Sequence, residues 1–171
     1  MAIIMAIDGS TKSTGIAIFN EQKLEHYECI VCNMSDTFAR IKIMACKIKE
    51  IHTKYNVNKV IMEDVIPEDV HHNDNVYTSL KYLQAAVVLG LHDLGQKVEF
   101  YVNSEWRKKC GIHTGRGIKR DSLKVEDVKF VKNKYNIDVN DDIADAICIG
   151  WAYTHNTPVA EPADSSGFDF R

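Results

Sequence analysis

No run of apolar residues in this 171-residue sequence is long enough to cross a membrane. The N-terminus also lacks the charged region and the cleavage site of a signal peptide. Cysteine is scarce and odd in number, at positions 29, 32, 46, 110 and 148, which does not indicate a disulfide framework. Together these absences predict a cytoplasmic protein with reduced thiols and without a membrane anchor.

Net positive charge is confined to one stretch of the chain. The segment from Arg107 to Lys134, called here the basic lobe, has ten Lys or Arg and three acids, a net charge of +7. The rest of the chain has 11 basic and 21 acidic residues, a net charge of −10. A basic lobe on an acidic body indicates a partner with phosphates, although a solvated lysine-rich helix gives the same pattern.

Apolar residues make up 45% of the sequence and charged residues 26%, as in ordinary globular domains. We expect one domain over residues 1–156, which is large enough to bury a real core. Residues 157–171 are rich in Pro, Asp, Ser and Gly, and we predict a disordered tail there.

Two predicted strands end in a carboxylate. Residues 2–7 are almost continuously apolar and are followed by Asp8, and the β-type run 59–62 is followed by Glu63. A carboxylate at the end of a buried strand loses hydration and needs a compensating partner. If the two strands are parallel neighbours joined through a helix, both acids lie at the same edge of one sheet, where α/β sites form.

A second pair of acids opens the last predicted helix. Asn140 is a good N-cap, and Asp142 and Asp145 are three residues apart, so both project from one face of the first turns. Acid enrichment at a helix N-terminus accounts for Asp142 but poorly for Asp145, which lies among apolar residues.

Four carboxylates in one site with little water would be very unfavourable unless cations compensate their charge. Mg²⁺ prefers oxygen ligands, and two such ions about 4 Å apart can activate a water and stabilise a leaving oxygen in phosphodiester cleavage. Asp8, Glu63, Asp142 and Asp145, taken with the basic lobe, therefore predict a metal-dependent nuclease.

Two other motifs with metal-ligand residue types are weaker. Cys29 and Cys32 have CxxC spacing, but no second CxxC exists, so we interpret them as structural. The pair His71-His72 lies in a predicted exposed loop, where zinc binding lacks other ligands and substrate contact is the minor alternative.

The remaining elements follow from periodicity and caps. We expect a second strand at 16–19 and an edge strand at 24–33. Helices are expected from a Ser35 cap to Tyr55, at 75–94, after an Asn103 or Ser104 cap, and at 121–135, with a strand at 97–102. Helix 75–94 has an apolar stripe wide enough to face both the sheet and a second subunit.

With these acids and elements in place, the chain resembles RuvC-type Holliday junction resolvases of the RNase H-like superfamily over about residues 1–155. The resemblance rests on Asp8 followed by Thr14-Gly15, on the strand-end Glu63, on the basic loop and helix with Lys119 and Lys124, and on Asp142-Ile-Ala-Asp145-Ala. It implies an α/β fold with a mixed five-stranded sheet, three antiparallel strands then parallel strands, flanked by helices. It also implies a homodimer that nicks opposed strands of a four-way DNA junction with Mg²⁺ or Mn²⁺.

By the same resemblance the four acids bind the metal, and Lys119 or Lys124 reaches the scissile phosphate. The expected DNA-binding residues are Arg107, Lys108, Arg116, Lys119, Arg120, Lys124, Lys129 and Lys132. No helicase or other protein partner can be named from the sequence.

The sequence also departs from the family. Gly9-Ser10 replace the usual Pro-Gly after the first Asp, and Gln84-Ala85-Ala86-Val87 replace a glycine-rich stretch, which leaves junction selectivity open.

A phage member of the family is one interpretation, and a less selective nuclease for branched or flapped DNA is another. Actin-like ATPases share the Asp-Gly-Ser-Thr turn but need two such domains. A non-catalytic DNA-binding module is disfavoured by four acids that repel phosphate.

Overall fold

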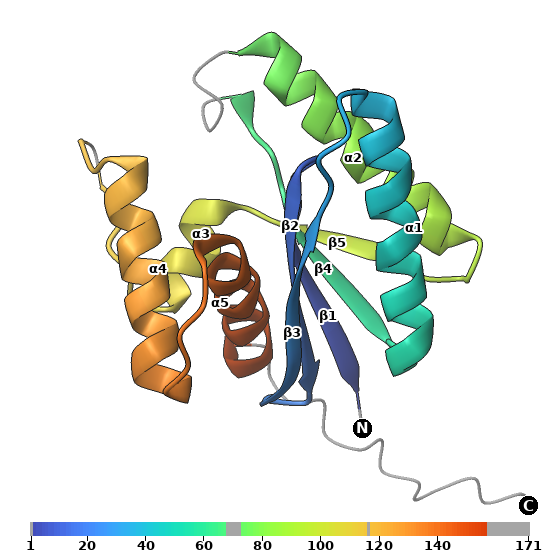
Figure 1. Cartoon of the computed structure of the whole chain (residues 1–171). Helices are drawn as coiled ribbons and strands as arrows, with labels where there is room; N and C mark the ends of the chain where they lie inside the picture. The colour runs from blue at the N-terminus through green and yellow to red at the C-terminus, as the bar shows by residue number, and fades with distance from the viewer. Residues whose placement is uncertain (1, 68–72, 116, 157–171) are drawn as a thin grey trace, which may run out of the picture.

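The computed structural model describes residues 2–67, 73–115 and 117–156. Within them, one five-stranded sheet has the order β3-β2-β1-β4-β5, and helices lie on both of its faces (Figure 1). β1, β2 and β3 pair antiparallel, whereas β4 pairs parallel with both β1 and β5, which confirms the predicted mixed sheet. The elements are β1 (Ile3–Asp8), β2 (Ser13–Asn20), β3 (Lys23–Val31), α1 (Thr37–Tyr55), β4 (Lys59–Glu63), α2 (Asp74–His92), β5 (Val98–Tyr101), α3 (Asn103–Lys109), α4 (Arg120–Tyr135) and α5 (Asp141–Asn156).

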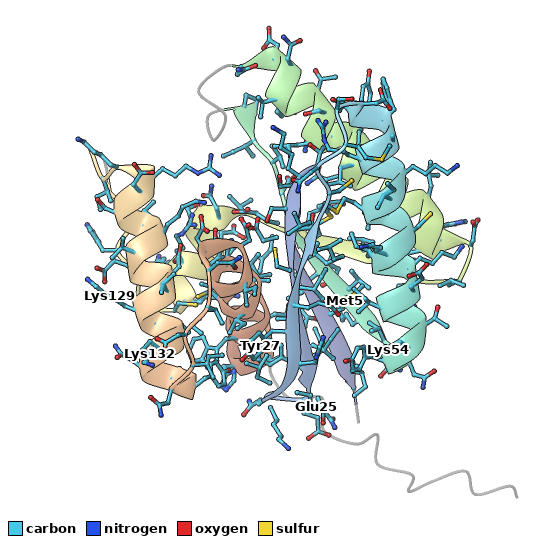
Figure 2. All side chains as sticks on the ribbon, in the orientation of Figure 1. Met5, Glu25, Tyr27, Lys54, Lys129 and Lys132 are labelled. Carbon is cyan, nitrogen blue, oxygen red and sulfur yellow. The ribbon has the colours of Figure 1, made fainter. Side chains whose placement is uncertain are left out.

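β1 forms the centre of the sheet because both of its faces are apolar. Successive side chains of a strand point to opposite faces. Met5 and Ile7 therefore pack toward α1 and α2, whereas Ile4 and Ala6 pack toward α5. Figure 2 shows Met5 on the α1 side of the sheet. Met5, Ala6 and Ile7 have no exposed surface, as predicted for a strand buried on both sides.

Two hydrophobic cores result, one on each face of the sheet. The core under α1 and α2 is built from Ile, Met, Leu and Val, with Met44, Ile48 and Leu83 fully buried. The core under α5 also receives α3 and α4, which pack on α5 from outside (Figure 1). Of the three helices on this side, α5 thus makes most of the contact with the sheet.

Small residues let α5 come close to the sheet. A Cβ placed on Gly150 would lie 2.3 Å from a ring carbon of Phe19, so only glycine fits there. Ala6 and Ala17 line the facing strands without exposed surface. Close approach of α5 matters because this helix carries two of the predicted acids.

The helix caps confirm some predictions and correct others. Asn140 caps α5 as predicted, since its side chain accepts a hydrogen bond from Ile143 N at 2.9 Å. The α1 cap is Asp36 and not Ser35, because the Asp36 carboxylate accepts from Ala39 N at 2.6 Å. α3 begins after Val102 without a side-chain cap, so the expected capping by Asn103 or Ser104 is wrong.

The apolar stripe of α2 is only partly used by the sheet. Leu83, Val87 and Leu91 are buried, whereas Val76 is 42% exposed and Leu89 is 69% exposed. The helix therefore presents an apolar surface that the described residues do not cover.

The five cysteines all lie within the described residues and are free thiols, as predicted. The described helices include none that is long and apolar enough to span a membrane. His71, His72 and the predicted tail 157–171 lie outside the described residues.

Candidate active site

The ends of β1 and β4 place two predicted carboxylates side by side. These strands are parallel neighbours, and Ile7 is in register with Met62. The next residues are Asp8 and Glu63, both half-buried. The prediction that the two strand-end acids share one sheet edge is therefore confirmed.

A glycine brings the start of α5 to the same edge. Gly15 on β2 is the register partner of Asp8, and a Cβ at Gly15 would lie 1.9 Å from the backbone oxygen of Asp142. Any side chain at position 15 would push the first turn of α5 away from β1. The Thr14-Gly15 pair thus has a packing reason, which is to let Asp142 and Asp145 approach Asp8.

All four acids line one cavity of about 640 Å³ at this edge of the sheet. Its lining also includes the cationic residues Lys12, Arg40, Arg107, Arg120 and Lys124. Asp145 is the most buried of the four acids, at 5% exposed. The cavity is thus lined by carboxylates and cations together.

Burial and, after it, the charges of neighbouring acids raise the pKa of two of these carboxyls well above the usual range. For Asp8 the causes are burial first, then the charge and hydrogen bond of Glu63 and the charge of Asp142. For Asp145 they are burial, then the charges of Asp8 and Asp127, while Arg107 acts in the opposite direction. Burial and the nearby like charges therefore disfavour the ionised form of both carboxyls.

Neighbouring groups fix the acids at the start of α5. Ser13 Oγ donates a hydrogen bond to Asp142 Oδ2 and lies 3.2 Å from Cys29 Sγ. Asp141 forms an ion pair with Lys124 from α4. The sequence did not indicate Ser13 or Asp141, because neither has a local pattern that marks a site.

The chemistry of this donor set suits a hard divalent cation, since it consists of carboxylate oxygens in a partly dry cavity. Oδ1 of Asp145 is buried and accepts no hydrogen bond from the described part of the chain. Nevertheless, no three His, Cys, Asp or Glu side chains among the described residues are grouped closely enough to hold a metal ion together. In this structure Asp142 is hydrogen-bonded to Ser13 and Asp145 to Arg107.

The structure distributes the cations of the basic lobe unequally. Lys124 and Arg120 line the cavity, whereas Lys119 precedes α4 as its N-cap residue and is exposed. Lys129 and Lys132 lie farther along α4 and point away from the sheet (Figure 2). They pair with Glu126 at 2.7 Å and Asp138 at 2.6 Å; Lys108 is exposed, and Arg116 lies outside the described residues.

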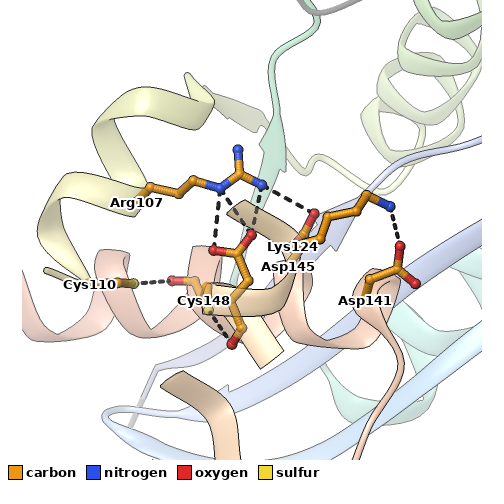
Figure 3. A network of polar contacts seen from close by, with 7 residues as sticks. Arg107, Cys110, Lys124, Asp141, Asp145 and Cys148 are labelled. Atoms are coloured by element: carbon orange, nitrogen blue, oxygen red, sulfur yellow. Dashed lines mark hydrogen bonds and ion pairs between the residues drawn. The ribbon is translucent and has the colours of Figure 1, made fainter. Parts of the chain in front are cut away.

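Arg107 is a correction to the sequence analysis. It was expected to hold the DNA backbone, but it is only 6% exposed and forms ion pairs with Asp127 and Asp145 (Figure 3). Its position in a run of basic residues suggested an exposed side chain, whereas the packing of α3 against α5 buries it. The sequence also missed Asp127, Lys12 and Arg40, which only the tertiary structure brings to the site.

Known structures share this architecture. RuvC of Thermus thermophilus in complex with a Holliday junction substrate superposes with a TM-score of 0.71 at 14% identity, covering 89% of this chain and 92% of that one. The Fowlpox virus resolvase in complex with a Holliday junction has a TM-score of 0.56 at 20% identity, covering 90% and 97%. The yeast mitochondrial Holliday junction resolvase Ydc2 has a TM-score of 0.59 at 11% identity, covering 90% and 78%.

Curated proteins give no match to this sequence. The family model described as crossover junction endodeoxyribonuclease RuvC, in contrast, matches residues 4–155, which include the sheet, the basic lobe and all four acids. The predicted RNase H-like fold and the predicted resolvase family are thus confirmed. The chain belongs to the RuvC family of Holliday junction resolvases, which are endodeoxyribonucleases that depend on a divalent metal.

Proposed function

We propose that Asp8, Glu63, Asp142 and Asp145 form the metal-binding catalytic centre with which this resolvase nicks opposed strands of a four-way DNA junction. The observation that carries the proposal is the convergence of the four acids on one cavity from two strand ends and one helix face. We further propose Mg²⁺ as the native metal, with two ions per site and Mn²⁺ as a substitute. Bound there, the metal would supply an activated water and stabilise the leaving oxygen.

The protein's own cations complete the site in this proposal. Burial lowers the pKa of the Lys124 ammonium, but its hydrogen bond and charge attraction to Asp141 raise that pKa overall. The ammonium therefore stays charged at the cavity wall, where it can stabilise negative charge that develops on the phosphate. Lys119 is the less favoured of the two lysines, because it is exposed and does not line the cavity.

The surface cations hold the DNA backbone in this proposal. Arg120 lines the cavity, and Lys108, Lys129 and Lys132 lie along α3 and α4, where they would exchange their present partners or water for phosphates. Contacts of this kind supply affinity without sequence information and weaken as salt rises. Arg116 stays a proposed contact on the strength of the sequence alone.

We propose that the enzyme works as a two-fold dimer, with α2 near the axis. Leu89 and Tyr82 are exposed on α2, and the Tyr82 ring lies 5.8 Å from that of Phe38 on α1, which is 66% exposed. A second copy would cover these side chains and present two sites to a substrate that is itself two-fold. Leu89→Arg should give a monomer in sedimentation at micromolar concentration, and an unchanged dimer would contradict this interface.

The domain boundary and cellular location complete the proposal. We place the catalytic unit in residues 1–156 and the enzyme in the cytoplasm, where DNA in a bacterial or phage-infected cell is recombined. Removing residues 157–171 should leave junction cleavage unchanged in vitro. A large loss of cleavage would show that the tail belongs to the catalytic unit.

Substrate selectivity is tested by three synthetic DNAs of equal length, a four-way junction, a flapped duplex and a linear duplex, each with and without Mg²⁺. We expect paired, symmetric nicks in the junction only, and only with Mg²⁺. Equal cleavage of the flapped duplex would favour the less selective nuclease. Binding of the junction without nicking in any divalent metal would contradict the proposed catalytic centre.

A further inference from the structure

A buried ionic cluster joins three helices behind the cavity. Arg107 of α3 contacts Asp127 of α4 through Nε at 3.0 Å and Nη2 at 2.9 Å from Oδ2, with Nε also 3.3 Å from Oδ1. The same Nη2 lies 3.4 Å from Oδ2 of Asp145 on α5. Figure 3 shows the Arg107 side chain extending toward Asp145 at the start of α5. One guanidinium thus spans two carboxylates from different elements.

The burial of this cluster makes its geometry specific. Arg107 is 6% exposed, Asp127 is 0% exposed and Asp145 is 5% exposed. A buried charge that loses its partners is costly, so burial strongly favours the arrangement in which the guanidinium contacts both carboxylates. The planar fork of arginine contacts both at once, which the single ammonium of lysine cannot reproduce.

Packing holds Arg107 independently of Asp145. The neighbouring Trp106 is fully buried in the core under α5, and the Arg107 guanidinium carbon lies 4.2 Å from the centre of its ring. The Arg107 backbone oxygen accepts a hydrogen bond from Ile112 N at 2.9 Å. Arginine and Asp127 together are therefore a fixed support against which Asp145 can be oriented.

The two oxygens of Asp145 are in different states. Oδ2 accepts the hydrogen bond from Arg107, whereas buried Oδ1 receives no donor from any described residue. Asp145 lines the cavity together with Asp8 and Glu63, and a cation could bind Oδ1 without displacing a hydrogen bond. A buried carboxylate oxygen without a donor is costly unless a ligand compensates for it.

We propose that Arg107, itself held by Asp127, is a positioning residue that fixes Asp145 Oδ2 so that Oδ1 is presented to the catalytic metal. This inference rests on the proposed function, in which Asp145 is a metal ligand. Arg107 does not touch the substrate in this role; it orients a carboxylate that would otherwise turn or pair elsewhere. Groups that orient metal ligands in this way typically change metal affinity or activity by about 10- to 100-fold when they are replaced.

The critical variant removes the support but restores a neutral interior. Arg107→Met with Asp127→Leu replaces the buried ion pair by apolar side chains, a change that interiors often tolerate. Arg107→Lys is the second variant, because it keeps the charge and the fold while losing the two-carboxylate contact. Val131→Ala is the matched control, since Val131 is fully buried in the same layer but lies in no ionic cluster.

Three measurements are made on each variant of the full chain. They are the rise of Tm on titration with Mn²⁺ or Mg²⁺, the single-turnover cleavage rate as a function of metal concentration, and junction affinity in EDTA. We expect the double variant and Arg107→Lys to need about 10- to 100-fold more metal for half-maximal effect. Junction affinity in EDTA should be unchanged, and Val131→Ala should lower Tm without changing the metal response.

Each alternative has a distinct outcome. A wild-type metal response in both Arg107 variants would overturn the proposal and leave Arg107 a purely structural residue. Loss of junction affinity in EDTA with an unchanged metal response would overturn it in favour of a DNA contact. Asp145→Asn shows which of the two ideas has failed. If Asp145 is not a metal ligand, so that the proposed function fails, Asp145→Asn keeps the full metal response. If only the positioning role of Arg107 fails, Asp145→Asn loses that response.

Discussion

The two faces of the sheet bury side chains of different character. The face under α1 and α2 packs large aliphatic side chains such as Met44, Ile48 and Leu83. The face under α5 combines small residues of the strands with a buried ionic cluster around Arg107. The first face mainly stabilises the fold, and α1 and α2 reach the cavity only at its wall, through residues such as Arg40 and Leu80. The second face must stabilise the fold and also hold buried charges at fixed positions. One sheet thus separates most of its stabilising core from its chemistry.

The largest effect on the cleavage rate is expected for the acids that line the cavity. Asp8→Asn, Glu63→Gln or Asp145→Asn should each lower single-turnover junction cleavage by roughly a thousandfold or more, because several kcal/mol of metal-dependent stabilisation is lost. Junction binding in EDTA should stay nearly normal. Asp93→Asn, an exposed aspartate paired with Lys49 on the other layer, is the control and should keep the wild-type rate.

A stability measurement on Asp8→Asn sharpens this result. The pKa of Asp8 is raised in the folded state, so its ionised form opposes folding increasingly as pH rises above the ordinary value of 3.8. Asparagine carries no charge, and the variant should therefore melt at a higher temperature than the wild type at neutral pH in EDTA. A lower Tm would mean that Asp8 serves the fold more than the site.

The next effect separates a cavity lysine from a surface lysine of the same helix. Lys124→Ala should lower the rate on saturating junction by about 100-fold, as expected for a donor to transition-state charge, with a smaller loss of affinity. Lys129→Ala should leave that rate near normal and lower affinity, with the salt dependence flattened by roughly one unit of slope. If both variants lose only affinity, Lys124 is not catalytic.

A smaller effect on the cleavage rate is expected at Gly15, for which Gly90 on α2 serves as the control. Gly15→Ala places a methyl group against the Asp142 backbone, so α5 must shift; we expect a loss of about 1–3 kcal/mol of stability and roughly a tenfold lower rate. Gly90→Ala, on α2, meets no described atom within 4 Å and should stabilise by about 0.5–1 kcal/mol. Thermal unfolding and single-turnover cleavage distinguish the two, and equal behaviour would remove the proposed link between Gly15 and the site.

The smallest effect on the rate is expected in the core under α1 and α2. Ile48→Ala should cost about 2–5 kcal/mol in the free energy of unfolding, because it opens a cavity in a fully packed core. The cleavage rate of the folded variant at 25 °C should nevertheless remain within about twofold of the wild type. A large loss of rate without unfolding would show that the two faces are coupled.

The sequence predicted the parts of this molecule that depend on local pattern. Strand endings identified Asp8 and Glu63, and a three-residue spacing behind a good cap identified Asp142 and Asp145. These signals work because strand and helix periodicity fix which side chains share an edge or a face. The mixed sheet, with three antiparallel strands and then parallel strands, followed from the family resemblance.

What the sequence could not provide is the set of long-range partners. Ser13 meets Asp142 across 129 positions, and Arg107 meets Asp145 across 38. No periodicity encodes such pairs, so Arg107 was assigned to the surface from the charge of its neighbours. Asp36 replaced Ser35 as a cap for a similar reason, since both residue types favour that position and geometry decides between them.

The most direct test of the account is calorimetric titration of Mn²⁺ into the wild-type protein and into Asp8→Asn/Asp145→Asn, without DNA. The four acids offer carboxylate oxygens in one partly buried cavity, so the wild type should bind Mn²⁺ saturably. The double variant should show no saturable binding over the same concentrations, while keeping its fold by circular dichroism. Equal binding by the two proteins would contradict the central claim that these carboxylates form the metal centre.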